Sequence, residues 1–337
     1  NRSMKLIYIP KRYIFNLFRI KFDADRQIVL SKEYSSQVQK KIFNKKYDLI
    51  LTSDTTTVSY LETETPIVLW LDTSFQSWYN HYYSNLKISK KSLREGNICE
   101  QNAINKSQRI LVTSAWAKKE ILKFYKCNPN KIKILPFGSN LEYNFSLSKI
   151  LKTKFKSSKK VCEIVSIGVD WKRKGFDRTI EICKLLKSKG LDISLKLIGA
   201  KSSKNLPKWV KVYNFLDKNI KSTHKIISKI LIKSDFHILM TKSEAYGVVF
   251  VEASSNGVFN IAPDIGGIRG AIKNNINGKL FNVKSTNIEI ANYIFKSYTN
   301  KKNLKKKIIS SKLFYEKNLD WKIIGKKFNS INKDLYN

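Results

Sequence analysis

Residues that bind transition metals or form disulfides are scarce in this sequence of 337 residues, which has four cysteines and three histidines. Cys99, Cys127, Cys162 and Cys183 nowhere form a C-x-x-C pair, and the histidines do not cluster with them. This spacing argues against a structural zinc site and against a disulfide framework. We therefore expect free thiols in a reducing, cytoplasmic compartment, and no metal.

Long apolar runs are also missing. No run approaches the about 18–20 residues that a membrane-spanning helix needs. The first residues, NRSMKLIYIP, lack the successive charged, apolar and small-residue zones of a signal peptide. The sequence therefore predicts no integral helical membrane protein and gives no support for secretion.

Acidic residues are few: 26 Asp and Glu stand against 64 Lys and Arg, which gives a net charge of +38. Only nine of the basic residues are arginine, whose planar side chain suits base and phosphate recognition best. Because lysine is spread along the whole chain, we interpret most of it as a solvated surface and expect no specific nucleic acid. Attraction to polyanions or anionic lipid heads stays open.

One basic and aromatic stretch, residues 11–22 (KRYIFNLFRIKF), has the composition of helices that lie at a membrane surface. It equally fits a helix packed on the first domain. We therefore keep a peripheral position on the inner face of a membrane as a hypothesis beside the cytoplasmic one.

Short apolar strands alternate with amphipathic helices along the chain. The strand segments are continuous apolar runs, typical of a parallel sheet covered on both faces. The clearest helix is 176–189, with Gly190 as its stop. The alternation predicts an α/β fold with crossover helices. The expected strands are Ile28–Leu30, Asp48–Thr52, Ile67–Leu71, Ile110–Thr113, Ile132–Pro136, Glu163–Ile167, Leu195–Ile198, Val210–Asn214, Phe236–Met240 and Asn260–Ala262.

The strand series breaks once, in the polar, Lys- and Ser-rich residues 139–160. Because the chain also exceeds the about 250–300 residues of a single core, we predict two Rossmann-like lobes that face each other across a cleft. The expected domains are 1–145, 146–315 and a C-terminal helix in 316–337.

Two motifs of the second lobe bear charge where a strand meets a helix. In SIGVDWKRKGFDRTIEI, Lys172, Arg173 and Lys174 stand before Gly175 and a helix start, which favours an anion site as much as a solvated charge run. In TKSEAYGVVFVEASSNG, Glu244 follows a strand and Glu252 lies in an apolar helix, so a buried, partnered carboxylate is expected.

Weaker candidates follow other strands. Gly266 and Gly267 form an amide-rich loop that suits phosphates or an ordinary turn, and Asp72, Ser114, Gly138 and Asn140 suit a site or a helix cap. Asp23 and Asp25 form a lone D-x-D, a weak match to metal-dependent nucleotide-sugar enzymes.

Together these motifs resemble a known family, the retaining glycosyltransferases of the two-lobed GT-B fold, family-4-like (glycosyl transferases group 1). The resemblance rests on Gly168-x5-Lys174-Gly175, Glu244-x7-Glu252 with Gly247 between them, Gly266-Gly267 and Pro136-Phe137-Gly138. It extends from about Asp48 to Trp321, and GVDWKRKG is similar to a subset of the family with a D-W-x-R-K-G string.

The resemblance implies a metal-independent hexosyltransferase without a cofactor. It would move a sugar from a UDP- or GDP-linked donor to a glycan or lipid-linked acceptor, with retention of configuration. Glu244 and Asp72 would be catalytic, Asp72 on the acceptor side, and Glu252 would hold the nucleotide ribose. The donor-binding set would be Arg173, Lys174, Gly175, Tyr246, Gly247, Glu252, Gly266 and Gly267.

The chain also departs from the family pattern. Val169 replaces a common arginine, Arg269 follows the Gly-Gly pair where an acidic residue is often seen, and the first strand and Gly-rich loop of relatives are not found, so the first lobe is expected to be incomplete. The alternative to an enzyme is a basic protein that binds polyanions or nucleic acid without catalysis.

Overall fold

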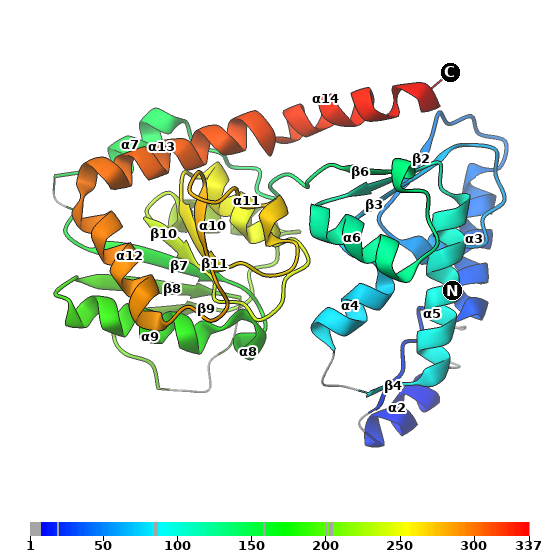
Figure 1. Cartoon of the computed structure of the whole chain (residues 1–337), viewed down its shortest axis with the longest axis horizontal. Helices are drawn as coiled ribbons and strands as arrows, with labels where there is room; N and C mark the ends of the chain where they lie inside the picture. Colours follow the sequence, from blue (N-terminus) through cyan, green and yellow to red (C-terminus); the bar gives the residue numbers. More distant parts are fainter. Residues whose placement is uncertain are drawn as a thin grey trace. The chain divides into compact units, whose positions relative to one another are not determined.

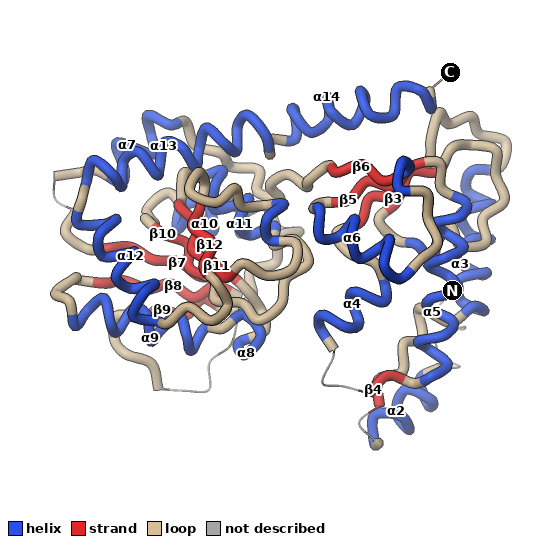
Figure 2. Tube along the Cα trace, viewed as in Figure 1, coloured by secondary structure: helices blue, strands red, loops and turns tan. Residues whose placement is uncertain are grey.

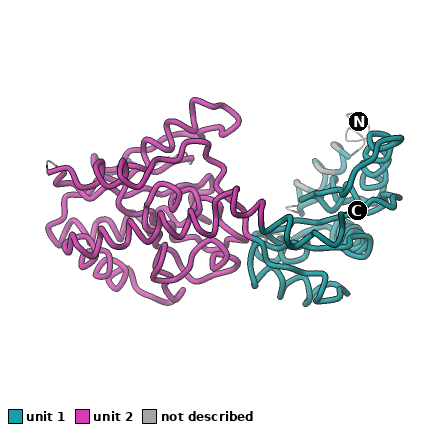
Figure 3. The backbone as a smooth tube through the Cα atoms, turned by 90° about the horizontal axis from the view of Figure 1, so that it is seen from above, with its two compact units in different colours: residues 1–135, 327–337 teal, residues 136–326 magenta. Residues whose placement is uncertain are grey.

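The structure is a computed structural model that describes residues 8–18, 20–83, 87–157, 159–199, 201 and 205–336. It divides into two compact units, residues 1–135 with 327–337, and residues 136–326 (Figure 3). The expected boundary at 145/146 lies inside unit 2. The reason is visible in two hydrogen bonds, because the carbonyl of Phe137 accepts from Tyr246 and that of Ser139 accepts from Trp321.

Unit 1 is built on a four-stranded parallel sheet of order β2-β3-β5-β6. Strand β3 is buried along its whole length, which agrees with its unbroken apolar sequence IVLWL. A two-stranded sheet pairs β1 with β4. The strands are β1 (Ile20–Lys21), β2 (Ile50–Thr52), β3 (Ile67–Leu71), β4 (Lys87–Ile88), β5 (Arg109–Val112) and β6 (Ile132–Ile134).

Helices flank the strands of unit 1 (Figure 1). These helices are α2 (Ile9–Leu17), α3 (Ile28–Ile42), α4 (Phe75–Tyr82), α5 (Lys90–Lys106) and α6 (Ala115–Phe124), with the short turns η1 (Thr55–Thr57), η2 (Pro129–Lys131) and η4 (Lys333–Leu335). The longest helix of this unit is α5.

The expected strand Ile28–Leu30 is wrong, because these residues form the first turn of α3. Three apolar residues alone carry neither a helical nor a strand period. The Glu95 carboxylate accepts a hydrogen bond from the Ile28 amide at 3.0 Å, which satisfies one free N–H of the helix start. Leu30 then packs with Tyr8 and Phe22 instead of joining the sheet.

Unit 2 contains a six-stranded parallel sheet of order β12-β11-β10-β7-β8-β9 (Figure 2). The chain runs outward from β7 to β9, returns, and runs outward in the other direction from β10 to β12. The strands are β7 (Cys162–Ile167), β8 (Ile193–Ile198), β9 (Val210–Tyr213), β10 (Phe236–Ile238), β11 (Phe259–Pro263) and β12 (Gly278–Phe281). The sequence had not predicted β12.

The helices of unit 2 are α7 (Leu147–Lys154), α8 (Trp171–Lys174), α9 (Phe176–Ser188), α10 (Lys221–Leu231), α11 (Val248–Ser255), α12 (Asn287–Thr299) and α13 (Lys301–Asn318), with the turn η3 (Ile268–Gly270). Helices α8 and α9 connect β7 to β8, α10 connects β9 to β10, and α11 connects β10 to β11, while α7 precedes β7 in the segment that the sequence marked only as polar. Helix α14 (Trp321–Asn332) starts in unit 2 and ends in unit 1, where Phe328 stacks on Trp70.

The predicted fold class is confirmed: both units are α/β, and both main sheets are parallel. In unit 2 the strand order reverses between β7 and β10. Ligands of such sheets bind where the loops of the two adjacent strands diverge at their carboxyl ends. No helix in the described part of the chain has the length and apolar character needed to cross a bilayer.

Candidate functional site

A buried ion pair lies at the strand reversal of unit 2. Lys174, in the loop region after β7, places its Nζ 2.5 Å from Oε2 of Glu244, which follows β10. Lys174 is 8% exposed and Glu244 is 7% exposed. Burial lowers the pKa of Lys174 and the adjacent Glu244 carboxylate opposes that shift. The two charges that the sequence placed 70 residues apart are therefore held together in a desolvated position.

Arg173 joins the two loops next to this pair. Its Nη1 donates to the carbonyl of Ser243 at 3.1 Å and lies 4.0 Å from Oε2 of Glu244. Its own carbonyl accepts from the Lys242 amide at 2.7 Å. Asp170 accepts from the Arg173 amide at 2.9 Å and caps the short helix α8. Two of the three predicted cations, Arg173 and Lys174, thus belong to one polar network with Glu244, whereas Lys172 is exposed.

Two glycines let the loops come this close. Gly175 has φ of 68°, and a Cβ placed there would lie 2.0 Å from the carbonyl oxygen of Met240. Gly168 leaves room for the Lys174 stem, because a Cβ would lie 2.6 Å from its Cγ. The amide of Gly267, after β11, donates to the carbonyl of Glu244 at 3.0 Å. Three loops at the carboxyl edge of the sheet are therefore in direct contact.

Gly247 has φ of 84° and starts α11, and Gly266 has φ of 57°, so both predicted glycines use the left-handed region. Arg269, the departure after the Gly-Gly pair, bonds to Asp264 with its Nε 2.8 Å from Oδ1. Its charge is thereby balanced at the protein surface.

Glu252 lies on α11 and is fully buried. Its Oε1 lies 2.5 Å from Nζ of Lys218, in the loop after β9, and its Oε2 has no hydrogen-bond partner among the described residues. Burial raises the pKa of Glu252, and Lys218 opposes that rise. A buried carboxylate with a vacant acceptor oxygen fits a ligand hydroxyl group.

The sequence did not single out Lys218. It follows β9 on the carboxyl side, so the rule that found Glu244 also applied to it. His224 fixes this loop: its Nδ1 accepts from the Glu142 amide at 3.2 Å, and its Nε2 therefore donates to the carbonyl of Lys218.

Tyr246 was expected among the donor-binding residues. The structure buries it to 2% exposure, and its hydroxyl donates to the Phe137 carbonyl at 2.6 Å. The two rings also meet edge to face at 5.7 Å. Burial raises the pKa of Tyr246. Its observed contacts therefore hold the Pro136–Gly138 segment to unit 2. Gly138 in turn packs against the Trp321 ring.

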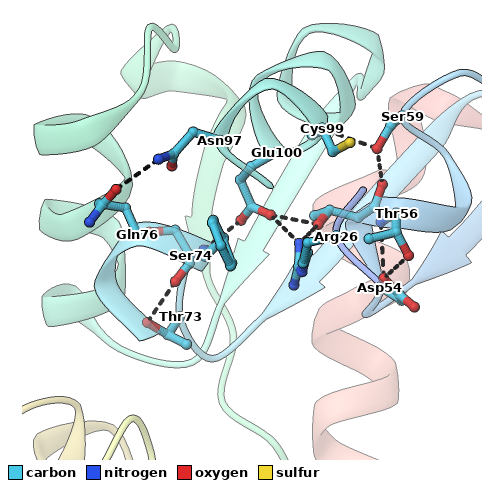
Figure 4. Close-up of polar contacts among 12 residues, drawn as sticks. Arg26, Asp54, Thr56, Ser59, Thr73, Ser74, Gln76, Asn97, Cys99 and Glu100 are labelled. Atoms are coloured by element: carbon cyan, nitrogen blue, oxygen red, sulfur yellow. Dashed lines mark hydrogen bonds and ion pairs between the residues drawn. The ribbon is translucent and has the colours of Figure 1, made fainter. Parts of the chain in front are cut away.

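Asp72 lies in unit 1, at the carboxyl end of β3, and is half-buried. The loop that follows is anchored by Glu100 of α5, whose Oε1 accepts from the Phe75 amide at 3.1 Å (Figure 4). The other oxygen of Glu100 accepts from Thr55 at 2.5 Å and from Arg26 at 3.0 Å. The sequence missed this buried Arg26–Glu100 pair, because its members are 74 positions apart.

The weaker candidates have local roles. Ser114 caps α6 by accepting from the Ala117 amide, Asn140 is exposed, and Asp25 accepts from the Tyr34 hydroxyl. Across the described ranges no group of three or more His, Cys, Asp or Glu side chains is arranged to hold a metal ion. A cavity of about 460 Å³ adjoins Gly175, Lys172 and Met240, and neither Glu244 nor Glu252 lines it.

The close approach at Gly175 yields a stability prediction. Gly175→Ala should lower the free energy of unfolding by about 1–3 kcal/mol more than Gly190→Ala, measured by urea denaturation. Gly190 has φ of 86°, and a Cβ added to it would meet no atom within 4 Å, so it shares only the backbone strain. Equal losses of unfolding free energy in the two variants would show that the Met240 carbonyl does not exclude a side chain at position 175.

Comparisons with known proteins agree with this geometry. Residues 148–313 match the family model described as Glycosyl transferases group 1. No curated protein sequence matches the chain. Among solved structures, sucrose-phosphate synthase from Thermosynechococcus elongatus has a TM-score of 0.70 at 13% identity, over 91% of this chain and 78% of that one.

Two further structures have the same fold. Anabaena HepE in complex with UDP and glucose gives a TM-score of 0.65 at 16% identity, over 90% of this chain and 81% of its own. WaaG, a glycosyltransferase involved in lipopolysaccharide biosynthesis, has a TM-score of 0.64 at 16% identity, over 93% of this chain and 85% of its own. Residues 148–313 therefore match the Glycosyl transferases group 1 model, and the chain has the fold of these solved glycosyltransferase structures.

Proposed function

We propose that this chain is a glycosyltransferase, which transfers a sugar from a nucleotide-sugar donor to an acceptor with retention of anomeric configuration and without a metal ion. The observation that carries the proposal is the buried Lys174–Glu244 pair at the strand reversal of unit 2, with Arg173 beside it. Such a position combines fixed positive charge with a carboxylate that can orient hydroxyl groups.

The charges suit the bond that breaks. When a glycosyl–phosphate bond cleaves, negative charge grows on the leaving diphosphate and positive charge grows on the sugar. Arg173 and Lys174 are already oriented and partly desolvated, so they can stabilise the leaving group without reorganisation. Glu244 would hold donor-sugar hydroxyls next to the reacting carbon. Both developing charges would then be stabilised by side chains of this chain.

Glu252 would hold the ribose of the donor. Its Oε2, which has no partner among the described residues, can accept a hydrogen bond from one hydroxyl group, and Lys218 contacts the other oxygen. A ribose diol would therefore bind next to Lys218 or displace it. HepE, whose structure contains UDP and glucose, supports a UDP-linked sugar as the first donor to test, and a GDP-linked one as the second.

On the acceptor side we propose Asp72, with a glycan or lipid-linked acceptor. Its loop is fixed by the Glu100–Phe75 hydrogen bond, which gives the carboxylate a defined position at the carboxyl end of β3. Attack on the same face of the sugar from which the diphosphate leaves would retain configuration. We assign no carboxylate as a covalent nucleophile.

The basic charge favours a second candidate function, binding of a polyanion without catalysis. Its specific observation is the net charge of +38. It predicts salt-sensitive retention on DNA and no sugar transfer. A protein that only binds polyanions has no need of a buried, oppositely charged pair such as Lys174–Glu244, so this pair favours the first candidate function.

The first experiment measures nucleotide release from UDP- and GDP-sugars with a chelator present. We expect turnover in the chelator, and its loss in both Lys174→Ala and Glu244→Ala, because each variant removes one half of the buried pair. Lys229→Ala is the matched control, since Lys229 is exposed on α10 and its removal changes the net charge equally. Full activity in either pair variant would remove that residue from the mechanism, and activity that vanishes with the chelator would overturn metal independence.

A second experiment addresses Glu252. Glu252→Gln should raise the donor KM by about 10- to 100-fold, because hydrogen bonds to a charged group contribute about 1.5–3 kcal/mol. Steady-state kinetics with varied donor measures it, with Glu181→Gln, an exposed α9 carboxylate, as control. An unchanged KM would assign the ribose to another residue.

We also propose that α2 contacts an anionic membrane surface. Four apolar side chains of α2 and of the residue after it are strongly exposed. They are Tyr13 at 71%, Ile14 at 54%, Leu17 at 70% and Phe18 at 70%. Its inner face is packed, since Phe15 stacks on Phe22 at 5.2 Å. The exposed side therefore has apolar anchors, and the chain supplies positive charge.

Vesicle sedimentation tests this surface. The chain should sediment with anionic vesicles more than with neutral ones, and Leu17→Ser with Phe18→Ser should reduce sedimentation at least about tenfold, since each buried apolar side chain contributes about 1.5–3 kcal/mol. Leu122→Ser, at a partly exposed apolar position of α6, is the control. Equal sedimentation with both lipids, or no effect of the double variant, would contradict the proposal.

A further inference from the structure

A second cationic cavity, of about 230 Å³, lies in unit 2 at the amino ends of β7 and β10. Four lysines line it: Lys154 at the end of α7, Lys156 and Lys159 in the segment before β7, and Lys301 at the start of α13. The donor residues proposed above follow the carboxyl ends of the same strands. The cavity is therefore at the opposite edge of the sheet and belongs to no function assigned so far.

Both oxygens of the carboxylate that lines this cavity already accept hydrogen bonds from the protein. Oδ1 of Asp235 accepts a hydrogen bond from Nζ of Lys159 at 2.7 Å, and its Oδ2 accepts one from the Glu163 amide at 2.9 Å. It is the one acidic residue among the lining residues, so four ammonium groups face a single carboxylate. The lining thus has three more lysines than carboxylates (four lysines less one aspartate), and its positive charge is greatest when Lys154 is protonated.

Two of the other lysines, Lys154 and Lys301, contact neutral groups directly. Lys154 is 3% exposed and donates to the carbonyls of Leu231, at 3.3 Å, and Ser234. Nζ of Lys301 lies 3.4 Å from the ring centroid of Tyr298. Carbonyl dipoles and an aromatic face orient an ammonium group but do not neutralise it.

The desolvation of this charge is visible in two pKa shifts. Burial lowers the pKa of Lys154 to about 7, with Asp235 and Glu163 opposing the shift and Lys159 adding to it. Burial likewise lowers the pKa of Lys301. An anion in the cavity would supply the charge that these lysines lack.

We propose that this cavity is a binding site for a tetrahedral dianion of the phosphate class, either free inorganic phosphate or the phosphoryl group of a small soluble ester. Three of the four lysines can donate charge-assisted hydrogen bonds to its oxygens, while Lys159 keeps Asp235 in place. The cavity of about 230 Å³ is large enough for such a group.

Binding at this site is linked to a proton. A dianion next to Lys154 favours the ammonium form, so it raises the pKa of that group from about 7. Lys154 therefore takes up a proton when the anion binds above pH 7, and the affinity of the site for the anion falls as the pH rises through that value. The groups that face Lys154 and enter this balance are Asp235, Glu163 and Lys159, with Lys301 and Lys156 across the cavity.

Titration calorimetry with sulfate tests the proposal on the whole chain, because sulfate stays a dianion across the pH range. We expect saturable binding at pH 6 that weakens by about tenfold or more at pH 8.5. Buffers of different ionisation enthalpy should reveal proton uptake at pH 8. Lys154→Met should still bind sulfate but lose this proton uptake.

Three lysine variants separate this site from others. Lys301→Gln should weaken sulfate binding by about tenfold, and Lys229→Gln, an exposed lysine of α10 with the same change in charge, should not. Lys174→Gln should keep the binding, because Lys174 belongs to the donor site. Inorganic phosphate and phenyl phosphate are then compared: tighter binding of the first indicates a free ion, and equal binding indicates a carried phosphoryl group.

Several results would overturn the proposal. They are the absence of saturable sulfate binding, equal weakening in Lys301→Gln and Lys229→Gln, and loss of binding in Lys174→Gln alone. The last result would place the anion at the donor site. It would leave the proposed transfer reaction standing, whereas failure of nucleotide release would not affect the sulfate site.

Discussion

The contact between Lys174 and Glu244 is the constraint on which unit 2 depends. Neither charge is stable alone at this depth, because burial of an unpaired ion costs several kcal/mol. The loops after β7 and β10 must therefore stay in contact. Gly168 and Gly175 have no side chain because the Lys174 stem and the Met240 carbonyl fill the adjacent space. One ion pair thus determines two glycines, two loops and the position of Arg173 between them.

The strand order explains why these residues meet. In a parallel sheet of order β12-β11-β10-β7-β8-β9 the chain leaves the centre twice, in opposite directions. The loops after β7 and β10 have adjacent starting points and diverging paths, so polar groups can enter between them without interrupting the core. Glu252 and Lys218 extend the same region toward α11 and β9. The amino edge has no such divergence, and its cavity is formed instead by helix ends and lysines.

Much of this could be predicted from the sequence, for physical reasons. Continuous apolar runs such as IVLWL identify buried parallel strands, and charged residues directly after them must lie at the carboxyl edge. The same reasoning failed for Ile28–Leu30, where a triplet has no measurable period and a distant glutamate completes a helix start. It also missed two ion pairs. Lys218 and its partner Glu252 are 34 positions apart in the sequence, and Arg26 and its partner Glu100 are 74 positions apart. Pairing across such distances is a property of the folded chain.

Hydrogen-bond accounting separates three of the buried carboxylates, Glu100, Glu252 and Glu244. Glu100 accepts from a backbone amide, a hydroxyl and a guanidinium, so both oxygens are satisfied and the group is structural. Glu252 has one oxygen on Lys218 and one with no partner in the described chain, a cost that a ligand hydroxyl group or a water molecule can relieve. Glu244 lies between these cases, bound to a lysine that a phosphate can also use. Burial alone would rank them equally; the unused acceptor and the shared cation distinguish a site from a scaffold.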